Sequence, residues 1–159
     1  MQAALHSTLL HHTVAKMQSE YLPLGTWHQE GLDPNGAAFL RYIGQKEEVA
    51  NLYSSHPVDL TFSKLPDGRY NMNITQKPIN RSQDIPFTLD EENVNRHQSG
   101  KTITTIFHWD PQTSTLQSQT SSNDGLSWTI DYHFVGYTLT MTRTAPSVQS
   151  VVRHVYVPS

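Results

Sequence analysis

The chain has 159 residues, of which 36% are hydrophobic and 16% are charged, and its net charge at pH 7 is −3. This length fits one domain with a single core, and the negative balance gives no general attraction to nucleic acid or to an anionic membrane. The absence of cysteine excludes disulfides, thiolate catalysis and cysteine-ligated zinc.

Residues 1–20 lack the features of a secretory signal peptide. Three histidines, His6, His11 and His12, interrupt the apolar stretch, and both a basic start and a clear cleavage site are missing. No run in the chain approaches the roughly 18 apolar residues that a membrane-spanning helix needs. We expect 1–20 to be a flexible or weakly helical extension, 21–159 to be the folded domain, and the protein to be cytoplasmic.

One strand and two short helices are predicted at the start of the domain. Residues 24–30 form the strand, in which Gly25 allows another segment to approach closely and Trp27 fills one end of a core. Asp33, followed by proline, is typical of the N-cap of a helix. A second helix is predicted over residues 45–53. The apolar positions of the two helices are Phe39, Leu40, Ile43, Val49 and Leu52.

Beyond residue 57 the sequence predicts only strands, joined by turns at short intervals. The clearest strand covers residues 128–134, and the last covers residues 147–157. Side chains alternate along a strand, so that Val152, His154 and Tyr156 share one face of the last one. The inward face of the clearest strand consists of Trp128, Ile130, Tyr132 and Phe134. The total of one initial and about nine later strands is typical of a sandwich or a barrel.

Four short motifs occur in order along the chain. They are Gly25-Thr26-Trp27, the helical segment 35–44, the run FTLDEE at residues 87–92, and the ending Val155-Tyr156. Together they resemble the G-x-W, first helix, F-x-L-x-x-E run and terminal R-x-Y of the intracellular lipid-binding proteins, the family of fatty-acid-binding and cellular retinoid-binding proteins. The resemblance implies an all-β fold, a ten-stranded antiparallel β-barrel (a calycin-like β-clam) with a helix-turn-helix cap between the first two strands.

In that family two arginines and the terminal tyrosine hold a ligand carboxylate inside the barrel. Tyr156 matches the tyrosine, whereas His154 and Tyr132 stand at the two arginine positions. Neither offers the fixed donor fork of a guanidinium, so the sequence leaves open whether a carboxylate is bound. We expect Tyr132, His154 and Tyr156 to bind a polar head group. The other expected ligand contacts are Trp128, Ile130, Phe134, Phe39, Leu40, Ile43 and Ile79.

These residues predict a carrier that holds one hydrophobic ligand, a fatty acid or a retinoid-like molecule, in an internal cavity. The helical cap and Ile79 would control access. We expect no cofactor, a monomer, no nucleic-acid partner, and transient membrane contact through the cap. No nucleophile elbow, phosphate loop or helical histidine pair supports an enzyme. Two alternatives stay open: a haem-binding barrel with His154 as axial ligand, and a ligand-free barrel that acts as an interaction module.

Overall fold

Ten antiparallel strands form one continuous sheet in the computed structural model, which describes residues 20–96 and 100–158. The predicted extension 1–20 therefore lies outside the described residues, apart from Glu20. The strands are β1 Gly25–Glu30, β2 Asp59–Lys64, β3 Tyr70–Gln76, β4 Arg81–Phe87, β5 Glu92–Arg96, β6 Thr102–Asp110, β7 Thr115–Ser122, β8 Ser127–Val135, β9 Thr138–Ala145 and β10 Val148–Val157. Their spatial order is β4-β3-β2-β1-β10-β9-β8-β7-β6-β5.

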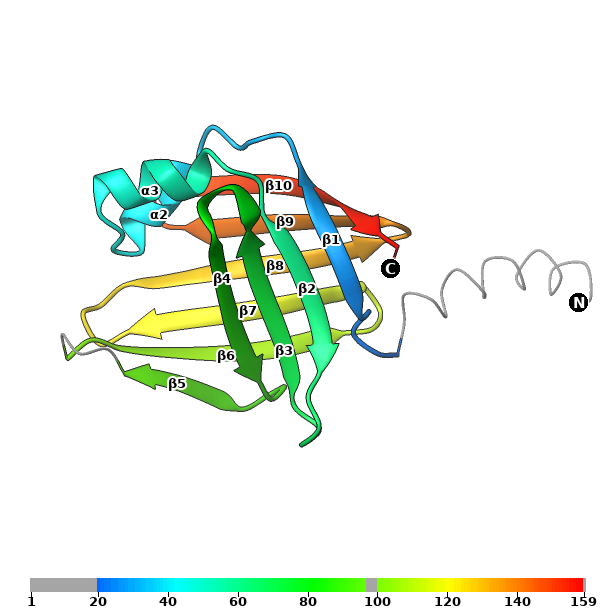
Figure 1. Cartoon of the computed structure of the whole chain (residues 1–159). Coiled ribbons are helices and arrows are strands. Elements are labelled where there is room, and N and C mark those ends of the chain that lie inside the picture. Colours follow the sequence, from blue (N-terminus) through cyan, green and yellow to red (C-terminus); the bar gives the residue numbers. More distant parts are fainter. Residues whose placement is uncertain (1–19, 97–99, 159) are drawn as a thin grey trace, which may run out of the picture.

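The strands form where the sequence alternates between apolar and polar side chains. In β2, for example, Leu60 and Phe62 are buried while Asp59, Thr61 and Ser63 are less so. Each strand thereby gives one face to the core and one to solvent. Figure 1 shows that β1 to β4 cross the other strands steeply, so that the sheet closes on itself as a barrel. The predicted all-β barrel is confirmed.

Two helices cover one end of the barrel (Figure 1). They are α2 Gly36–Tyr42 and α3 Glu47–Ser54, and they lie between β1 and β2 as expected. We call them the cap. A single helical turn, η1 Lys77–Ile79, joins β3 to β4.

The first helix starts later than the sequence predicts. Its N-cap is Asn35, which makes no side-chain capping bond, and not Asp33. Asp33 instead closes a turn ahead of the helix, because its carboxylate Oδ1 accepts the backbone N–H of Asn35 and its carbonyl accepts that of Gly36. Such a turn is a common use of aspartate outside a helix, and it delays the first helical residue.

Polar side chains tie the cap to both halves of the barrel. Asn35 Nδ2 donates to the carbonyl of Gln149 on β10 at 2.9 Å, which holds the start of α2. At the end of α3, the buried Gln76 of β3 donates through Nε2 to the carbonyls of Tyr53 (2.6 Å) and His56 (2.9 Å). The cap is therefore attached to β3 on one side and to β10 on the other.

Aromatic rings fill the end of the barrel opposite the cap. Trp27 lies in edge contact with Phe62, Phe134 and Tyr156, with ring centroids 6.0, 5.1 and 5.5 Å apart. Here β1 pairs with β10, and Trp27 stands opposite Tyr156. Gly25 has a φ of +143°, and a Cβ there would lie 2.8 Å from the ring carbon Cε1 of Tyr156. The close approach predicted for Gly25 is thus the one that closes the barrel.

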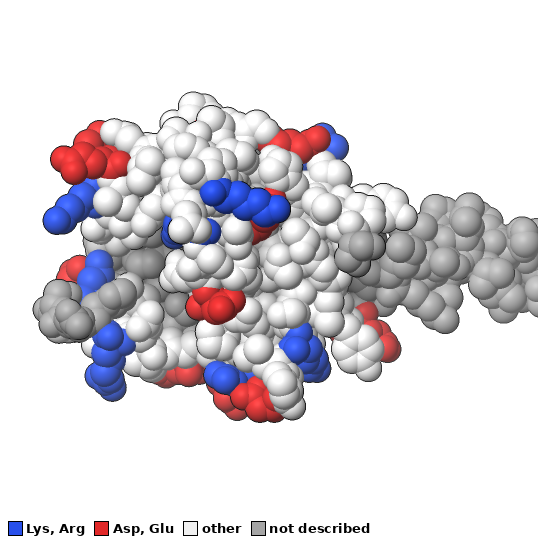
Figure 2. Space-filling model, in the orientation of Figure 1, with Lys and Arg blue, Asp and Glu red and all other residues white. Residues whose placement is uncertain are grey.

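The two ends of the sheet, β4 and β5, are not paired with each other. Side chains and backbone both span the opening between them. Phe87 of β4 stacks on Phe107 of β6 with centroids 4.1 Å apart, and the backbone of Leu89 forms an isolated β-bridge with that of Phe107. Figure 2 shows acidic and basic side chains interspersed on an otherwise uncharged outer face. Across residues 20–96 and 100–158, no helix is long and apolar enough to cross a membrane.

Candidate ligand-binding cavity

An internal cavity of about 530 Å³ lies between the cap and the strands. Its wall comes from nearly all parts of the barrel, because the inward faces of β2, β3, β4, β6, β7, β8 and β9 all contribute. The main apolar lining residues are Phe39, Leu40, Ile43, Val58, Leu60, Met72, Ile74, Ile85, Trp128, Ile130 and Met141. The cavity belongs to the cap half of the barrel, since the aromatic cluster around Trp27 fills the other half.

Six of the ten predicted ligand contacts line this cavity. They are Phe39, Leu40, Ile43, Trp128, Ile130 and Tyr132. Phe39 and Trp128 belong to a small apolar cluster under the cap. Tyr132 is buried, and burial raises the pKa of its phenol. The phenol therefore stays protonated, which leaves it able to donate a hydrogen bond.

The other four, Phe134, His154, Tyr156 and Ile79, lie outside the cavity wall. Phe134 and Tyr156 pack on Trp27 in the aromatic cluster, and Ile79 lies in the turn η1. His154 does point inward, as predicted, but it is fully buried between Gln29 of β1 and Leu139 of β9 and is not part of the cavity wall.

His154 is fully buried, and the positive charge of Arg143 acts on it. Neither ring nitrogen has a hydrogen-bond partner among the described residues. Burial lowers the pKa of the imidazole to about 4, and the nearby backbone of Leu139, its cross-strand neighbour, opposes that shift only in part. Because His154 is fully buried and lies outside the cavity wall, it does not offer an axial ligand to a haem in the cavity, and the haem alternative does not fit.

Two arginines that the sequence analysis did not place line the cavity instead. Arg143 of β9 donates to the hydroxyl of the buried Ser150 through Nε at 3.1 Å and through Nη2 at 2.7 Å. Its guanidinium also lies 4.9 Å from the ring centre of Phe39. Arg81 of β4 donates through Nη1 to Gln76 Oε1 at 2.9 Å and stacks over the ring of Tyr53 at 3.8 Å.

Solved structures of other proteins share this architecture. The fatty-acid-binding protein of Schistosoma mansoni in complex with arachidonic acid matches with a TM-score of 0.71 at 16% identity, over 85% of this chain and 96% of that one. The chain has the fold of the fatty-acid-binding proteins. The fluorescent protein UnaG matches with a TM-score of 0.70 at 18% identity, over 84% of this chain and 96% of that one. An abundant heat-soluble (SAHS) protein of Ramazzottius varieornatus matches with a TM-score of 0.72 at 19% identity, over 88% of this chain and 98% of that one.

No protein-family profile matches the sequence, and no curated protein matches it either. The fatty-acid-binding fold implied by the four sequence motifs is nevertheless confirmed by the structures. Within this fold the chain differs from the pattern that the resemblance implies. Its cavity arginines come from β4 and β9, whereas the two expected arginine positions carry Tyr132 on β8 and His154 on β10.

The sequence does contain a signal for both arginines. Arg143 follows Leu139 and Met141 at intervals of two on β9, so the alternation that turns those residues inward also turns Arg143 inward. On β4, Arg81 is separated from Ile85 and Phe87 by even numbers of positions, so the same alternation places it on their face of the strand. What the pattern lacks is the position of the cap, whose aromatic rings cover both guanidinium groups.

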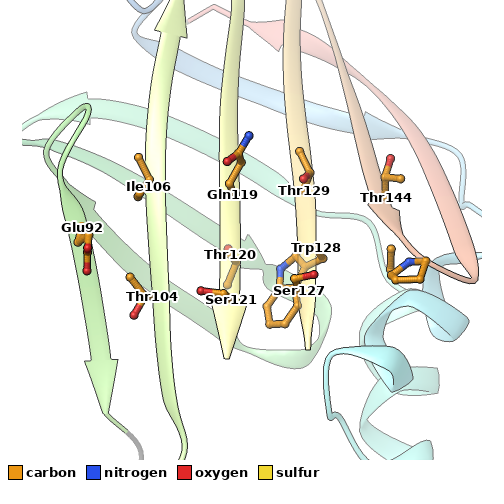
Figure 3. A pocket seen from close by; sticks show the side chains of 12 residues that line it. Glu92, Thr104, Ile106, Gln119, Thr120, Ser121, Ser127, Trp128, Thr129 and Thr144 are labelled. Carbon is orange, nitrogen blue, oxygen red and sulfur yellow. The ribbon is translucent and has the colours of Figure 1, made fainter. Parts of the chain in front are cut away.

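A larger hollow of about 770 Å³ lies on the outside of the barrel. Figure 3 shows its floor as a row of cross-strand neighbours, Ile106, Gln119, Thr129 and Thr144, on four adjacent strands. These side chains point away from the interior, and the hollow is open to solvent. The internal cavity is the better candidate for a ligand site, because it is more enclosed and is lined by apolar side chains from the cap and the barrel.

Proposed function

We propose that this chain is a carrier that binds one hydrophobic ligand in its internal cavity. The observation that carries the proposal is the cavity of about 530 Å³ with largely apolar walls. Ligand sites usually span about 300–1,000 Å³, and apolar burial stabilises a complex by about 25 cal/mol per Å² before ordering costs. The shared fold with a fatty-acid-binding protein that contains arachidonic acid supports the same conclusion.

We infer a binding role rather than catalysis from the charged groups in the cavity. Arg81, Lys101 and Arg143 are among its lining residues. Arginine and lysine keep their protons near neutral pH, so they orient a ligand better than they serve as general bases.

The cap is the proposed route into the cavity. Phe39, Leu40 and Ile43 of the α2 region form part of the wall, so displacing this helix would open the interior. On α3, Leu52 is 45% exposed and offers an apolar side chain for transient membrane contact during ligand transfer. We further propose that the carrier is a cytoplasmic monomer, in line with its lack of cysteine.

A dye-displacement experiment tests the carrier function. Nile red, an uncharged dye that brightens in apolar surroundings, would be bound first and then displaced by palmitate, hexadecanol or retinol. The variant Ile74→Trp pushes a ring into the cavity and displaces about two ligand methylenes. At about 0.8 kcal/mol each, affinity should fall by about tenfold. The matched control is Val151→Trp, at a position 52% exposed on β10, which should bind as the wild type does.

Two results would contradict the carrier proposal. One is a well-folded protein, judged by near-ultraviolet circular dichroism, from which none of these compounds displaces the dye. The other is an equal effect of Ile74→Trp and Val151→Trp, which would place the bound dye outside the cavity. Either result would favour the interaction-module alternative.

A further inference from the structure

The charge of the cavity wall is opposite in sign to that of the whole chain. Three cations, Arg81, Lys101 and Arg143, line the cavity together with one carboxylate, Asp33. The chain as a whole has a net charge of −3. Lys101 is neutralised by Asp124, with its Nζ 3.4 Å from Oδ2, but neither arginine forms an ion pair with a carboxylate of the described residues.

Arg143 is the more enclosed of the two arginines. It lies against the start of α2, where a Cβ on Gly36 would be 3.4 Å from its Nη2. Its Nε and Nη2 both donate to Ser150 Oγ, and Nη1 has no hydrogen-bond partner among the described residues. Desolvation lowers the pKa of Arg143, although the guanidinium remains charged. A desolvated cation whose partners are a hydroxyl and an aromatic ring, with no ion pair, is costly unless an anion joins it.

Arg81 repeats this arrangement on the other half of the barrel. Its partners are the neutral side-chain oxygens of Gln76 and Gln83 and the ring of Tyr53 on α3. Each arginine is therefore covered by an aromatic ring of the cap, Phe39 over Arg143 and Tyr53 over Arg81. Both positive charges face the cavity directly under the cap.

We propose that the cavity binds an amphiphilic anion whose carboxylate or phosphate group is held under the cap by Arg143 and Ser150, with Arg81 as a second positive charge. The proposal rests on the carrier function above and names the ligand class for the same cavity. The head group would bind Arg143 on β9 and Ser150 near the start of β10, and not His154 and Tyr156 further along β10, where the sequence resemblance placed it. The tail would lie along the apolar wall formed by Leu60, Met72 and Ile130.

Asp33 is the internal competitor for this anion. Its charge acts on Arg143, yet the two groups do not form an ion pair, and Asp33 Oδ2 is buried without a hydrogen-bond partner. A bound anion would be repelled by this carboxylate. Asp33→Asn should therefore tighten the binding of an acid by a few-fold, and it should leave the binding of an alcohol unchanged.

The test compares three ligands that share a sixteen-carbon chain and differ in the head group. Palmitate, hexadecyl phosphate and hexadecanol each displace Nile red from the protein at about pH 8, where both acids are ionised. We expect at least one acid to bind ten or more times tighter than the alcohol, and the stronger acid identifies the head group. Arg143→Met should weaken that acid by at least about tenfold and change the alcohol by less than about twofold. The control is Arg153→Met, an exposed arginine on β10 paired with Glu30.

The failure of this inference differs from the failure of the carrier proposal. If the acids and the alcohol bind equally well, or if Arg143→Met weakens all three alike, the anion site is refuted while the carrier remains. If none of the three displaces the dye, the carrier itself is refuted. Replacing a buried charge by an apolar side chain is often tolerated. Should Arg143→Met fail to fold, Arg81→Met and Ser150→Ala decide in its place, because each must reduce the preference for the acid over the alcohol.

Discussion

The buried imidazole of His154 should make the stability of the fold depend on pH. In the folded protein, burial lowers the pKa of His154 to about 4, whereas in an unfolded chain it has the ordinary histidine value of 6.5. Between these two values the unfolded chain takes up a proton that the folded protein does not bind. Stability is therefore fully present above about pH 6.5, and it falls as the pH decreases towards about 4.

The size of the effect follows from the pKa difference. A difference of about 2.5 units, at about 1.36 kcal/mol per unit, corresponds to a loss of about 3 kcal/mol once the pH is below both values. This is a large part of the roughly 5–15 kcal/mol that stabilises an ordinary domain. Hydrogen bonds also lower the pKa of some carboxylates, that of Asp84 through Asn73 and that of Asp110 through Thr113. Their ordinary pKa is 3.8, so their contribution to stability is lost only at a lower pH than that of His154.

Urea unfolding followed by tryptophan fluorescence, repeated between about pH 7.5 and 4.5, measures this loss. His154→Leu removes the titrating group and should flatten the dependence by up to about 3 kcal/mol. The control His133→Gln changes an exposed histidine of β8 and should keep the slope of the wild type. An equal slope in the wild type and in His154→Leu would refute the reasoning, since it would mean that His154 takes up its proton without unfolding.

Two further substitutions test how the barrel and its cap are held together. Gly25→Ala should destabilise the fold by about 2–4 kcal/mol in urea unfolding. The new Cβ would lie 2.8 Å from the Tyr156 ring, and the backbone φ of +143° strains any residue other than glycine. An unchanged unfolding midpoint would contradict this expectation. Gln76→Ala leaves the carbonyls of Tyr53 and His56 without their donor, so we expect a loss of about 1–3 kcal/mol and faster ligand release in stopped-flow displacement. The control Gln112→Ala, at an exposed position outside the cavity wall, should show neither effect.

The strands and helices of this fold could be predicted because each strand is buried on one face only. In β8 the alternation of Trp128, Ile130, Tyr132 and Phe134 with polar residues is sufficient to identify both the strand and its inward face. The start of α2 was less predictable. The side chain of Asp33 can either cap a helix or close a turn, and the local sequence does not distinguish the two uses.

The site could be predicted only in part, since alternation tells which residues point inward but not which of them border empty space. Tyr132 and His154 both point inward, yet only Tyr132 reaches the cavity. Which inward positions border the cavity depends on side chains from distant strands that fill part of the barrel, such as Trp27 and Phe62, which pack together with Phe134. Arg143 was missed for a similar reason: a charged residue near a strand end is usually solvated, and only the cap encloses this one.

The pairing of β1 with β10 has a consequence for the synthesis of the chain. β1 ends at Glu30, and its partner β10 does not begin until Val148. At about 5–20 residues per second, a ribosome needs roughly 6 to 24 s to translate the intervening segment. During that time Trp27 has no Tyr156 to pack against, and one edge of β1 lacks a partner strand. The barrel can thus close only after translation of its last strand, and until then this edge of β1 is open to pairing with another chain.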